Sequence, residues 1–266
     1  MSIDKLREHR RIWARKPAFR RVYRRLCERV WSLCSPHRPI VELGCGAGLF
    51  REFYPDVIAT DVTPTRWTNL ACDASRLSFA TDSVGNLVMI DVFHHLAGPR
   101  AFLAEAARVL KPGGRTVMLE PWTSWLGYRF YRYIHHESAD YDADPDHPFG
   151  PNKHPFEGNA AMPRMHFGPD REGSRRLLRE LGLAIVSVQP VPALGAILTG
   201  GFRPYGFTRG WMVPALQGID TFLQPLSRWL GLRAFVVMEK TAARIDTRLR
   251  PAREPRAVTQ ASLGVA

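Results

Sequence analysis

Three glycines stand at every second position where an apolar segment ends. Pro39–Leu43 is short and apolar enough for a buried strand, and it leads directly into Gly44, Gly46 and Gly48. Glycine lets the backbone approach a ligand at a distance where a Cβ atom would collide. The spacing therefore predicts a strand, loop and helix unit that holds a small ligand against its loop.

Two acidic residues beside this loop indicate the chemistry of that ligand. Glu42 lies inside the expected strand, and Asp61 ends the next one, Val57–Asp61, 19 residues later. An acid in the second position can accept hydrogen bonds from both hydroxyls of a ribose. A carboxylate at Glu42 favours a cationic group and would repel a pyrophosphate. The pair favours S-adenosylmethionine (SAM), a nucleoside with a sulfonium and an ammonium group, over NAD.

Four motifs in series resemble those of class I SAM-dependent methyltransferases. They are VELGCGAG, ATDV, CDASRLSFATDSVGNLVMIDVFHHL and AEAARVLKPGGRTVMLEP, in this order within residues 40–121. Their joint occurrence is far more specific than a glycine loop alone. The resemblance implies methyl transfer from SAM on an α/β fold. That fold is a Rossmann-like, seven-stranded, mostly parallel sheet with an antiparallel last strand and helices on both faces.

The resemblance also implies the roles of the cofactor-binding residues. It places Glu42 and the glycines at the methionine end of SAM, Asp61 at the ribose and Asp73 at the adenine. Asp91 and Phe93 would line the floor near the sulfonium. The full predicted set is Glu42, Gly44, Cys45, Gly46, Gly48, Asp61, Val62, Asp73, Ala74, Asp91 and Phe93, with Cys45 filling space in the loop.

A methyl acceptor that is an alcohol or phenol needs a base. The candidates are His94, His95, His135, His136, Glu120 and Glu137, of which the four histidines are the predicted catalytic residues. Because neighbouring residues point in different directions, one of His94 and His95 is expected to be structural. A helix over Trp125–His136 would place Tyr128 and His135 on roughly one face.

The sequence predicts no metal site. The paired histidines suggest metal ligands, as do the aspartates at positions 140, 142, 144 and 146. The aspartate run lacks the glycine at position six and the glutamate at position twelve of a calcium loop. The four cysteines, at 27, 34, 45 and 72, form no CxxC pair, which favours reduced thiols in the cytoplasm.

The remaining elements divide the chain into three parts. Residues 1–38 are a basic N-terminal helical region, and 241–266 are a basic tail that is expected to be disordered. Residues 39–240 are the methyltransferase domain, with insertions at about 121–168 and 189–217 after strands five and six. Helices are predicted at Ala18–Leu33, Pro99–Leu110, Asp170–Leu181 and Gly218–Leu230, and further strands at Leu87–Asp91, Thr116–Glu120, Leu183–Val188 and Ala234–Glu239.

The net charge of +12 is concentrated at the chain ends, where residues 1–38 hold 12 Lys or Arg and 3 Asp or Glu. Such ends can bind an anionic membrane surface or nucleic acid. Arginines beside an apolar stripe in Ala18–Leu33 are typical of an interfacial helix, and equally of a helix packed over a site. The sequence has no apolar run of about 18 residues and no secretory signal. A cytoplasmic enzyme with an optional peripheral membrane contact is therefore expected.

These observations predict methyl transfer from SAM to a small-molecule acceptor. The segments YRYIHHES, MPRMHFG and AILTGGF resemble a bacterial subgroup associated with surface saccharide or lipid biosynthesis, which implies a lipid-linked or saccharide-like acceptor. One alternative is a nucleic-acid methyltransferase, although DVFHHL replaces the Asn/Asp-Pro-Pro-aromatic motif that suits a base amine. The other alternative is a non-catalytic SAM-binding scaffold. The methylated atom and the oligomeric state stay open.

Overall fold

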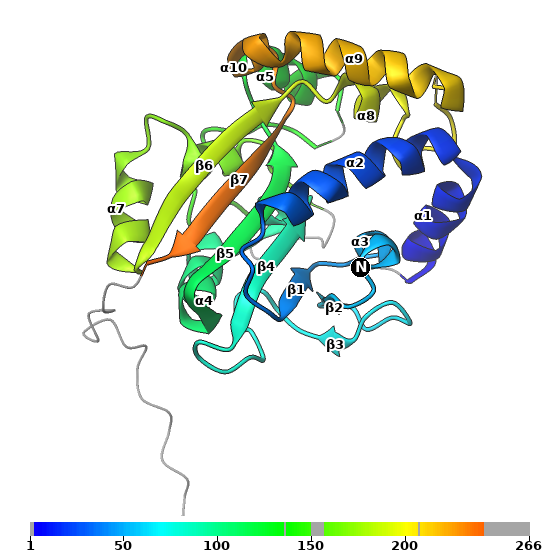
Figure 1. Ribbon diagram of the computed structural model, residues 1–266. Coiled ribbons are helices and arrows are strands. Elements are labelled where there is room, and N and C mark those ends of the chain that lie inside the picture. The colour runs from blue at the N-terminus through cyan, green and yellow to red at the C-terminus, as the bar shows by residue number, and fades with distance from the viewer. Residues whose placement is uncertain (1–2, 136, 150–156, 207, 242–266) are drawn as a thin grey trace, which may run out of the picture.

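The computed structural model describes residues 3–135, 137–149, 157–206 and 208–241, and its centre is one seven-stranded sheet. The strands are β1 (Ile40–Leu43), β2 (Ile58–Asp61), β3 (Leu70–Ala71), β4 (Val84–Ile90), β5 (Leu110–Pro121), β6 (Leu183–Val191) and β7 (Arg233–Lys240). Their order is β3-β2-β1-β4-β5-β7-β6 (Figure 1), and β7 is antiparallel to both of its neighbours. The predicted Rossmann-like, mostly parallel sheet is confirmed.

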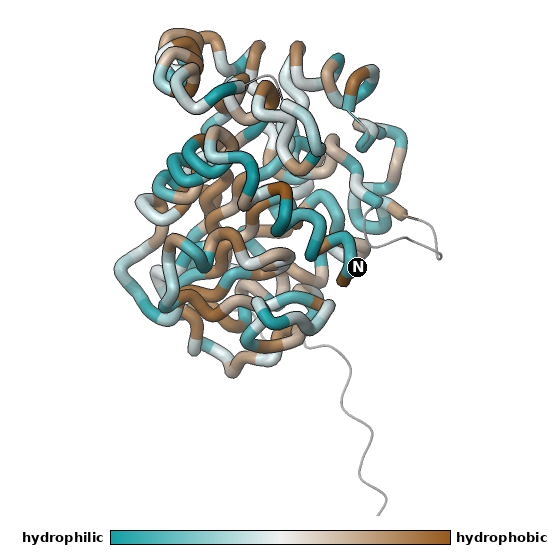
Figure 2. The backbone as a smooth tube through the Cα atoms, turned by 90° about the vertical axis from the view of Figure 1, so that its right-hand side faces the viewer, coloured by the Kyte–Doolittle hydropathy of each residue, from teal (hydrophilic) through white to brown (hydrophobic). Residues whose placement is uncertain are grey.

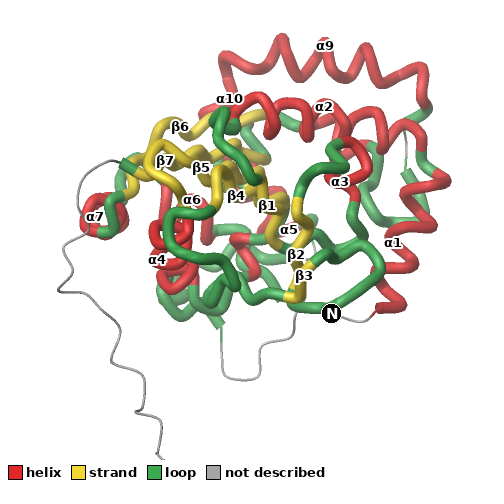
Figure 3. The backbone as a smooth tube through the Cα atoms, turned by 60° about the horizontal axis from the view of Figure 1, so that its bottom comes forward, coloured by secondary structure: helices red, strands yellow, loops and turns green. Residues whose placement is uncertain are grey.

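Helices cover both faces of the sheet (Figure 3). The α-helices are α1 (Ile3–Arg15), α2 (Pro17–Leu33), α3 (Leu49–Phe53), α4 (Pro99–Val109), α5 (Trp125–Tyr133), α6 (Met162–Phe167), α7 (Glu172–Glu180), α8 (Leu194–Leu198), α9 (Val213–Leu223) and α10 (Ser227–Leu230). Side chains of α4, α6 and α7 pack on one face, and those of α2 and α3 pack on the other.

Strand β4 lies between the helices on the two faces of the sheet, and all seven of its residues are buried. Successive side chains of a strand point to opposite faces. Leu87 and Met89 accordingly join the cluster that contains Phe102 of α4, whereas Val88 and Ile90 join the cluster formed with α2 and α3. Hydrophobic segments therefore run through the middle of the molecule (Figure 2).

The N-terminal helices are packed against this domain. The apolar stripe of α2 is buried, with Cys27 and Val30 against the sheet and Val22 against Val213 of α9. That stripe lies inside the protein and is not free to enter a membrane surface. No helix within the described ranges is long and apolar enough to cross a membrane.

Several boundaries differ from the sequence predictions. Strand β5 begins at Leu110 and not at the predicted Thr116, so Lys111–Gly114 are part of the strand. Strand β3 has only two residues, both exposed, and is too short for a periodic signal. The helix predicted over Trp125–His136 ends at Tyr133, so it does not place His135 on a helix face. The predicted insertion at 189–217 contains α8 and the start of α9. The predicted disordered tail lies outside the described residues apart from position 241.

Candidate active site

The glycine loop joins β1 to α3 in a conformation that favours glycine. Gly44, Gly46 and Gly48 all have positive φ angles, of 68°, 52° and 70°. A Cβ atom on Gly44 would lie 2.6 Å from a side-chain carbon of Val92, and one on Gly48 would lie 2.7 Å from Cβ of Trp67. The glycines therefore let the loops after β4 and β2 pack directly against this turn.

Glu42 is a buried carboxyl group at the base of the loop. Its side chain comes from the buried strand β1, and among the described residues its Oε2 has no hydrogen-bond partner. Burial, assisted by the nearby charge of Asp61, raises the pKa of Glu42 to about 8. A buried oxygen without a partner is costly, and a cationic ligand group would satisfy it.

Asp61 connects the glycine loop to the end of β2. Its Oδ2 accepts a hydrogen bond of 2.9 Å from the backbone N–H of Gly46, and its Oδ1 accepts one of 2.9 Å from Thr63. Each carboxylate oxygen has a second lone pair, so Asp61 keeps acceptor capacity for a diol. The bond to Gly46 is a loop-positioning role that the sequence did not reveal, because it depends on how β1 and β2 lie side by side.

The other predicted cofactor residues of this edge differ in exposure. Cys45 and Ala74 are buried, whereas Val62 is 62% exposed. Asp73 follows β3, and its Oδ1 accepts hydrogen bonds of 2.8 Å from the N–H and the hydroxyl of Ser75. Of these four residues, Val62 and Asp73 present side chains at the surface.

Asp91 and Phe93 follow β4 but face different surroundings. Asp91 has a positive φ angle of 58°, and its carboxylate forms an ion pair with Arg233 of β7. Phe93 has no exposed surface, and its ring packs against Phe102 and Phe167. The ring therefore belongs to the core beside α4.

Glu120, at the end of β5, is fully buried and holds the turn after β4. Its Oε1 accepts hydrogen bonds of 2.9 and 2.8 Å from the backbone N–H groups of Val92 and Phe93, and its Oε2 lies 2.6 Å from Nδ1 of His94. Burial alone would raise the pKa of Glu120, but these hydrogen bonds lower it. Both oxygens of Glu120 therefore hold the turn after β4 and the His94 ring in place.

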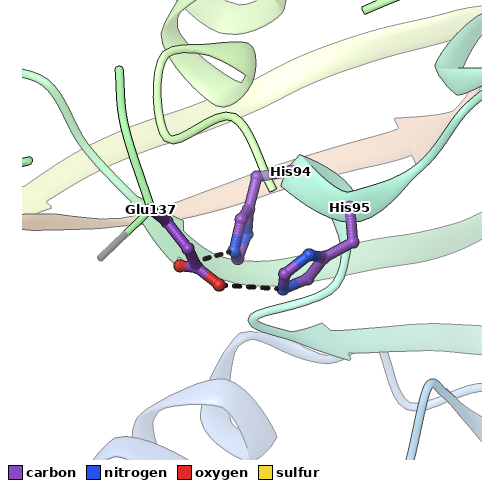
Figure 4. Close-up of side chains that lie close together, drawn as sticks. All are labelled: His94, His95 and Glu137. Carbon is purple, nitrogen blue, oxygen red and sulfur yellow. Dashed lines mark ion pairs between the residues drawn. The ribbon is translucent and has the colours of Figure 1, made fainter. Parts of the chain in front are cut away.

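His94 and His95 lie together in a single 3-10 turn, Phe93–His95 (η1), with their ring centroids 4.0 Å apart. Both rings reach Glu137 (Figure 4). Nε2 of His94 lies 3.4 Å from Oε2 of Glu137, and Nε2 of His95 lies 3.5 Å from Oε1. Nδ1 of His95 lies 3.0 Å from the backbone oxygen of Glu157. The expectation that the two rings point apart is wrong, because a 3-10 turn places neighbouring side chains closer together than a strand does.

Of the second histidine pair, His135 borders the same group, with Nδ1 3.7 Å from Oε2 of Glu137. His136 lies outside the described residues. Three of the predicted candidate bases, His94, His95 and His135, therefore lie next to Glu137. This arrangement requires the insertion after α5 to fold back over β4.

The pKa values of the three residues in this cluster are shifted far from their ordinary values. Burial favours a neutral His94, but the contacts of its ring with the carboxylates of Glu120 and Glu137 raise its pKa to about 10. Burial and the charge of His94 lower the pKa of His95 to about 4. Burial would raise the pKa of Glu137, but His94 and its histidine neighbours lower it to about 2. At neutral pH the charged ring of His94 and the neutral ring of His95 therefore both face the carboxylate of Glu137.

Comparison with known proteins identifies the fold around these residues. Residues 41–118 match the family described as "Methyltransferase domain". Residues 41–118 therefore carry a methyltransferase domain. None of the curated proteins matches the sequence.

Solved structures share the fold of this methyltransferase at low sequence identity. A putative sarcosine dimethylglycine methyltransferase from Galdieria sulphuraria is 14% identical with a TM-score of 0.50, over 90% of this chain and 98% of the other. A SAM-dependent methyltransferase from Archaeoglobus fulgidus is 17% identical with a TM-score of 0.49, over 84% and 94%. At 14% identity, the first of these likenesses shows the fold alone.

SAM is the cofactor of this methyltransferase domain, and the loop residues fit it. The unsatisfied oxygen of Glu42 suits a cationic ligand, and the spare lone pairs of Asp61 suit a ribose. The turn at Gly44, Gly46 and Gly48 carries no side chain that would separate backbone and ligand.

Proposed function

We propose that this methyltransferase acts on a small-molecule acceptor bound between the glycine loop and the cluster of His94, His95 and Glu137. The observation that carries the proposal is the position of Val92. Its side chain lies against Gly44, and its backbone N–H donates to Glu120, which holds His94. The predicted cofactor loop and the charged cluster are therefore neighbours at one edge of the sheet.

The residues have separate tasks in this proposal. When bound, SAM supplies an electrophilic methyl group on its sulfonium. Glu42 binds the cationic end of the cofactor and Asp61 binds the ribose, while Asp73 is proposed at the adenine. His94 keeps its proton and donates a hydrogen bond, whereas the neutral ring of His95 offers an acceptor. Alignment behind the methyl group and exclusion of water are the main requirements of such a transfer.

We propose His94, His95, His135 and His136 as the residues that contact or activate the acceptor. The first three support this role by their approach to Glu137. The remaining proposed cofactor contacts are Cys45, Val62, Ala74 and Asp91, together with the backbone of Phe93.

A cavity of about 790 Å³ near the end of β5 supports a saccharide-like or lipid-linked acceptor. It borders Thr123 and Tyr141, which lie three and four residues after Glu120 and Glu137 respectively. Aromatic rings and guanidinium groups share its lining: Trp125, Tyr128, Tyr141, Trp229, Arg129, Arg164, Arg171 and Arg228. Flat rings pack against sugar rings and arginines bind phosphate or carboxylate groups, so this lining suits a glycosyl or anionic part of the acceptor.

The first experiment is calorimetric titration of the full chain with SAM and with S-adenosylhomocysteine, using NAD as a control ligand. We expect micromolar SAM binding that Asp61→Ala weakens by about 1–3 kcal/mol, with no binding of NAD. A folded wild-type protein that binds no SAM would overturn the cofactor assignment.

The second experiment supplies labelled SAM with three acceptor pools: nucleotide-linked sugars, polar lipids and total RNA. Label in the first or second pool supports the proposed acceptor class. Label in RNA would favour the nucleic-acid alternative, and SAM binding without transfer to any pool would favour a scaffold.

A further inference from the structure

Three electron-rich side chains converge beside the glycine loop from two separate segments. His94 and His95 come from the turn after β4, and Glu137 comes from the insertion after α5 (Figure 4). One nitrogen of each ring and one carboxylate oxygen all lie within 4.8 Å of one another. We propose that His94, His95 and Glu137 bind a divalent first-row transition metal ion, with zinc as the reference ion.

The hydrogen bonds of the two rings direct the correct nitrogen atoms toward this point. Nδ1 of His94 faces the carboxylate of Glu120, and Nδ1 of His95 faces the carbonyl oxygen of Glu157. A carbonyl or carboxylate oxygen only accepts, so Nδ1 carries the hydrogen on each ring. On the neutral His95 ring Nε2 is then a lone pair aimed at Glu137. On the charged His94 ring a metal ion would take the place of the Nε2 proton that faces Glu137, because metal ligation needs a neutral imidazole.

The distances suit a shared cation better than direct hydrogen bonds. The two contacts between Nε2 atoms and Glu137 are 3.4 and 3.5 Å long. A charge-assisted N–H···O bond is about 2.7–2.9 Å long. Two ligand atoms that each lie about 2.0–2.1 Å from a tetrahedral zinc ion are roughly 3.3 Å apart. Each of the two observed contacts is close to that edge length, and the two contacts end on different oxygens of the Glu137 carboxylate.

The buried nitrogen of His94 supports the same conclusion independently. The His94 side chain is 2% exposed, and among the described residues its Nε2 has no hydrogen-bond partner. Its other nitrogen is held by Glu120, which also accepts two backbone N–H groups. A carboxylate behind a histidine orients the ring and increases its basicity as a metal ligand.

The absence of a side chain at Gly158 lets the two rings take these positions. Gly158 lies over both rings, and a Cβ atom there would lie 2.8 Å from Cε1 of His95 and 2.9 Å from Cδ2 of His94. Two imidazoles and one carboxylate favour zinc, iron, manganese or cobalt over magnesium and calcium, which prefer all-oxygen sites. Three protein ligands leave a coordination position for a further group.

The open position suggests a role, and this part of the inference rests on the proposed function. A hydroxyl group of the acceptor that occupied it would have a lowered pKa and a fixed orientation. Metal binding itself does not depend on methyl transfer, so the two proposals can fail separately.

The test is zinc binding by the full chain in the absence of SAM. The protein is dialysed against a chelator, returned to metal-free buffer and titrated with Zn²⁺ by calorimetry. We expect one ion per chain, with at least a hundredfold weaker binding in His95→Ala and in Glu137→Gln. The matched control is His147→Ala, because the His147 side chain is 81% exposed and forms its ion pair with Asp144, outside the cluster.

Two further measurements keep the result interpretable. Circular dichroism identifies any variant that fails to fold, and thermal melting measures the rise in Tm that Zn²⁺ causes in the wild type. Co²⁺ absorption separates histidine and carboxylate ligands from the cysteine thiolates, which give an intense charge-transfer band. Zinc binding that His95→Ala and Glu137→Gln leave unchanged would overturn the proposal, as would a wild type that binds no Zn²⁺.

Discussion

Glu42 should link cofactor binding to pH, and Glu42→Gln should remove that link. The pKa of Glu42 is about 8, and its Oε2 is buried without a partner among the described residues. At pH 7 the carboxyl group is therefore mostly protonated in the free protein. A cationic ligand favours the ionised form, so its binding must release this proton.

The size of the effect follows from that pKa. With a value of about 8, roughly one molecule in ten has an ionised Glu42 at pH 7 and roughly nine in ten at pH 9. SAM affinity of the wild type should therefore rise about tenfold, or about 1.4 kcal/mol, between pH 7 and pH 9 relative to Glu42→Gln. The glutamine variant is the matched control because its amide keeps the shape but does not titrate.

Calorimetry at pH 7, 8 and 9 measures this difference directly. At pH 7, titrations in two buffers of different ionisation enthalpy should show about one more proton released per SAM by the wild type than by Glu42→Gln. Titration of SAM itself and of other protein groups contributes equally to both proteins. Equal pH dependence in the two proteins would refute the assignment of Glu42 to the cationic end of SAM.

The same pKa predicts an opposite effect on the stability of the free protein. The folded pKa of about 8 lies above the ordinary value of 4.5. The protonated carboxyl group of Glu42 stabilises the folded protein fully below pH 4.5, and this stabilisation is lost as the pH rises from 4.5 through 8. The glutamine variant does not undergo this loss. The free energy of unfolding of Glu42→Gln, measured relative to wild type, should therefore be roughly 4 kcal/mol higher at pH 9 than at pH 5. Urea denaturation at the two pH values measures the difference.

Three other substitutions test separate parts of the site. Asp61→Ala should lower SAM affinity by about 1–3 kcal/mol in calorimetry, whereas a loss below twofold would exclude Asp61 from the ribose site. Gly44→Ala places a methyl group against Val92 at a positive φ angle, which should cost about 1–3 kcal/mol of stability in urea denaturation; an unchanged midpoint would contradict the strained turn. Arg233→Met removes the partner of Asp91, so the pKa of Asp91 should rise further. The stability lost relative to wild type should then be larger at pH 7 than at pH 4, and the reverse order would show that the pair does not stabilise the fold.

The local features of this protein could be predicted from the sequence. The strand before Gly44, the three glycines and Asp61 are signals from adjacent residues, and their conformations depend mainly on neighbours in the chain. The alternation of buried strands with helices similarly predicted the parallel sheet, whereas the antiparallel last strand was implied by the resemblance to class I methyltransferases. The strands β1, β2 and β4 supply the edge on which the proposed SAM site stands, so this part of the site was also predictable.

The grouping of His94, His95 and Glu137 could not be predicted from the sequence, because it depends on tertiary structure. His94 and Glu137 belong to segments with no common periodicity, and only the folding of the insertion over β4 brings Nε2 within 3.4 Å of the carboxylate. The ion pair of Asp91 with Arg233 likewise joins positions 142 residues apart. An amphipathic stripe such as that of α2 predicts burial but not against which surface. Sequence patterns encode the local backbone, whereas contacts between distant segments require the packing of the whole chain.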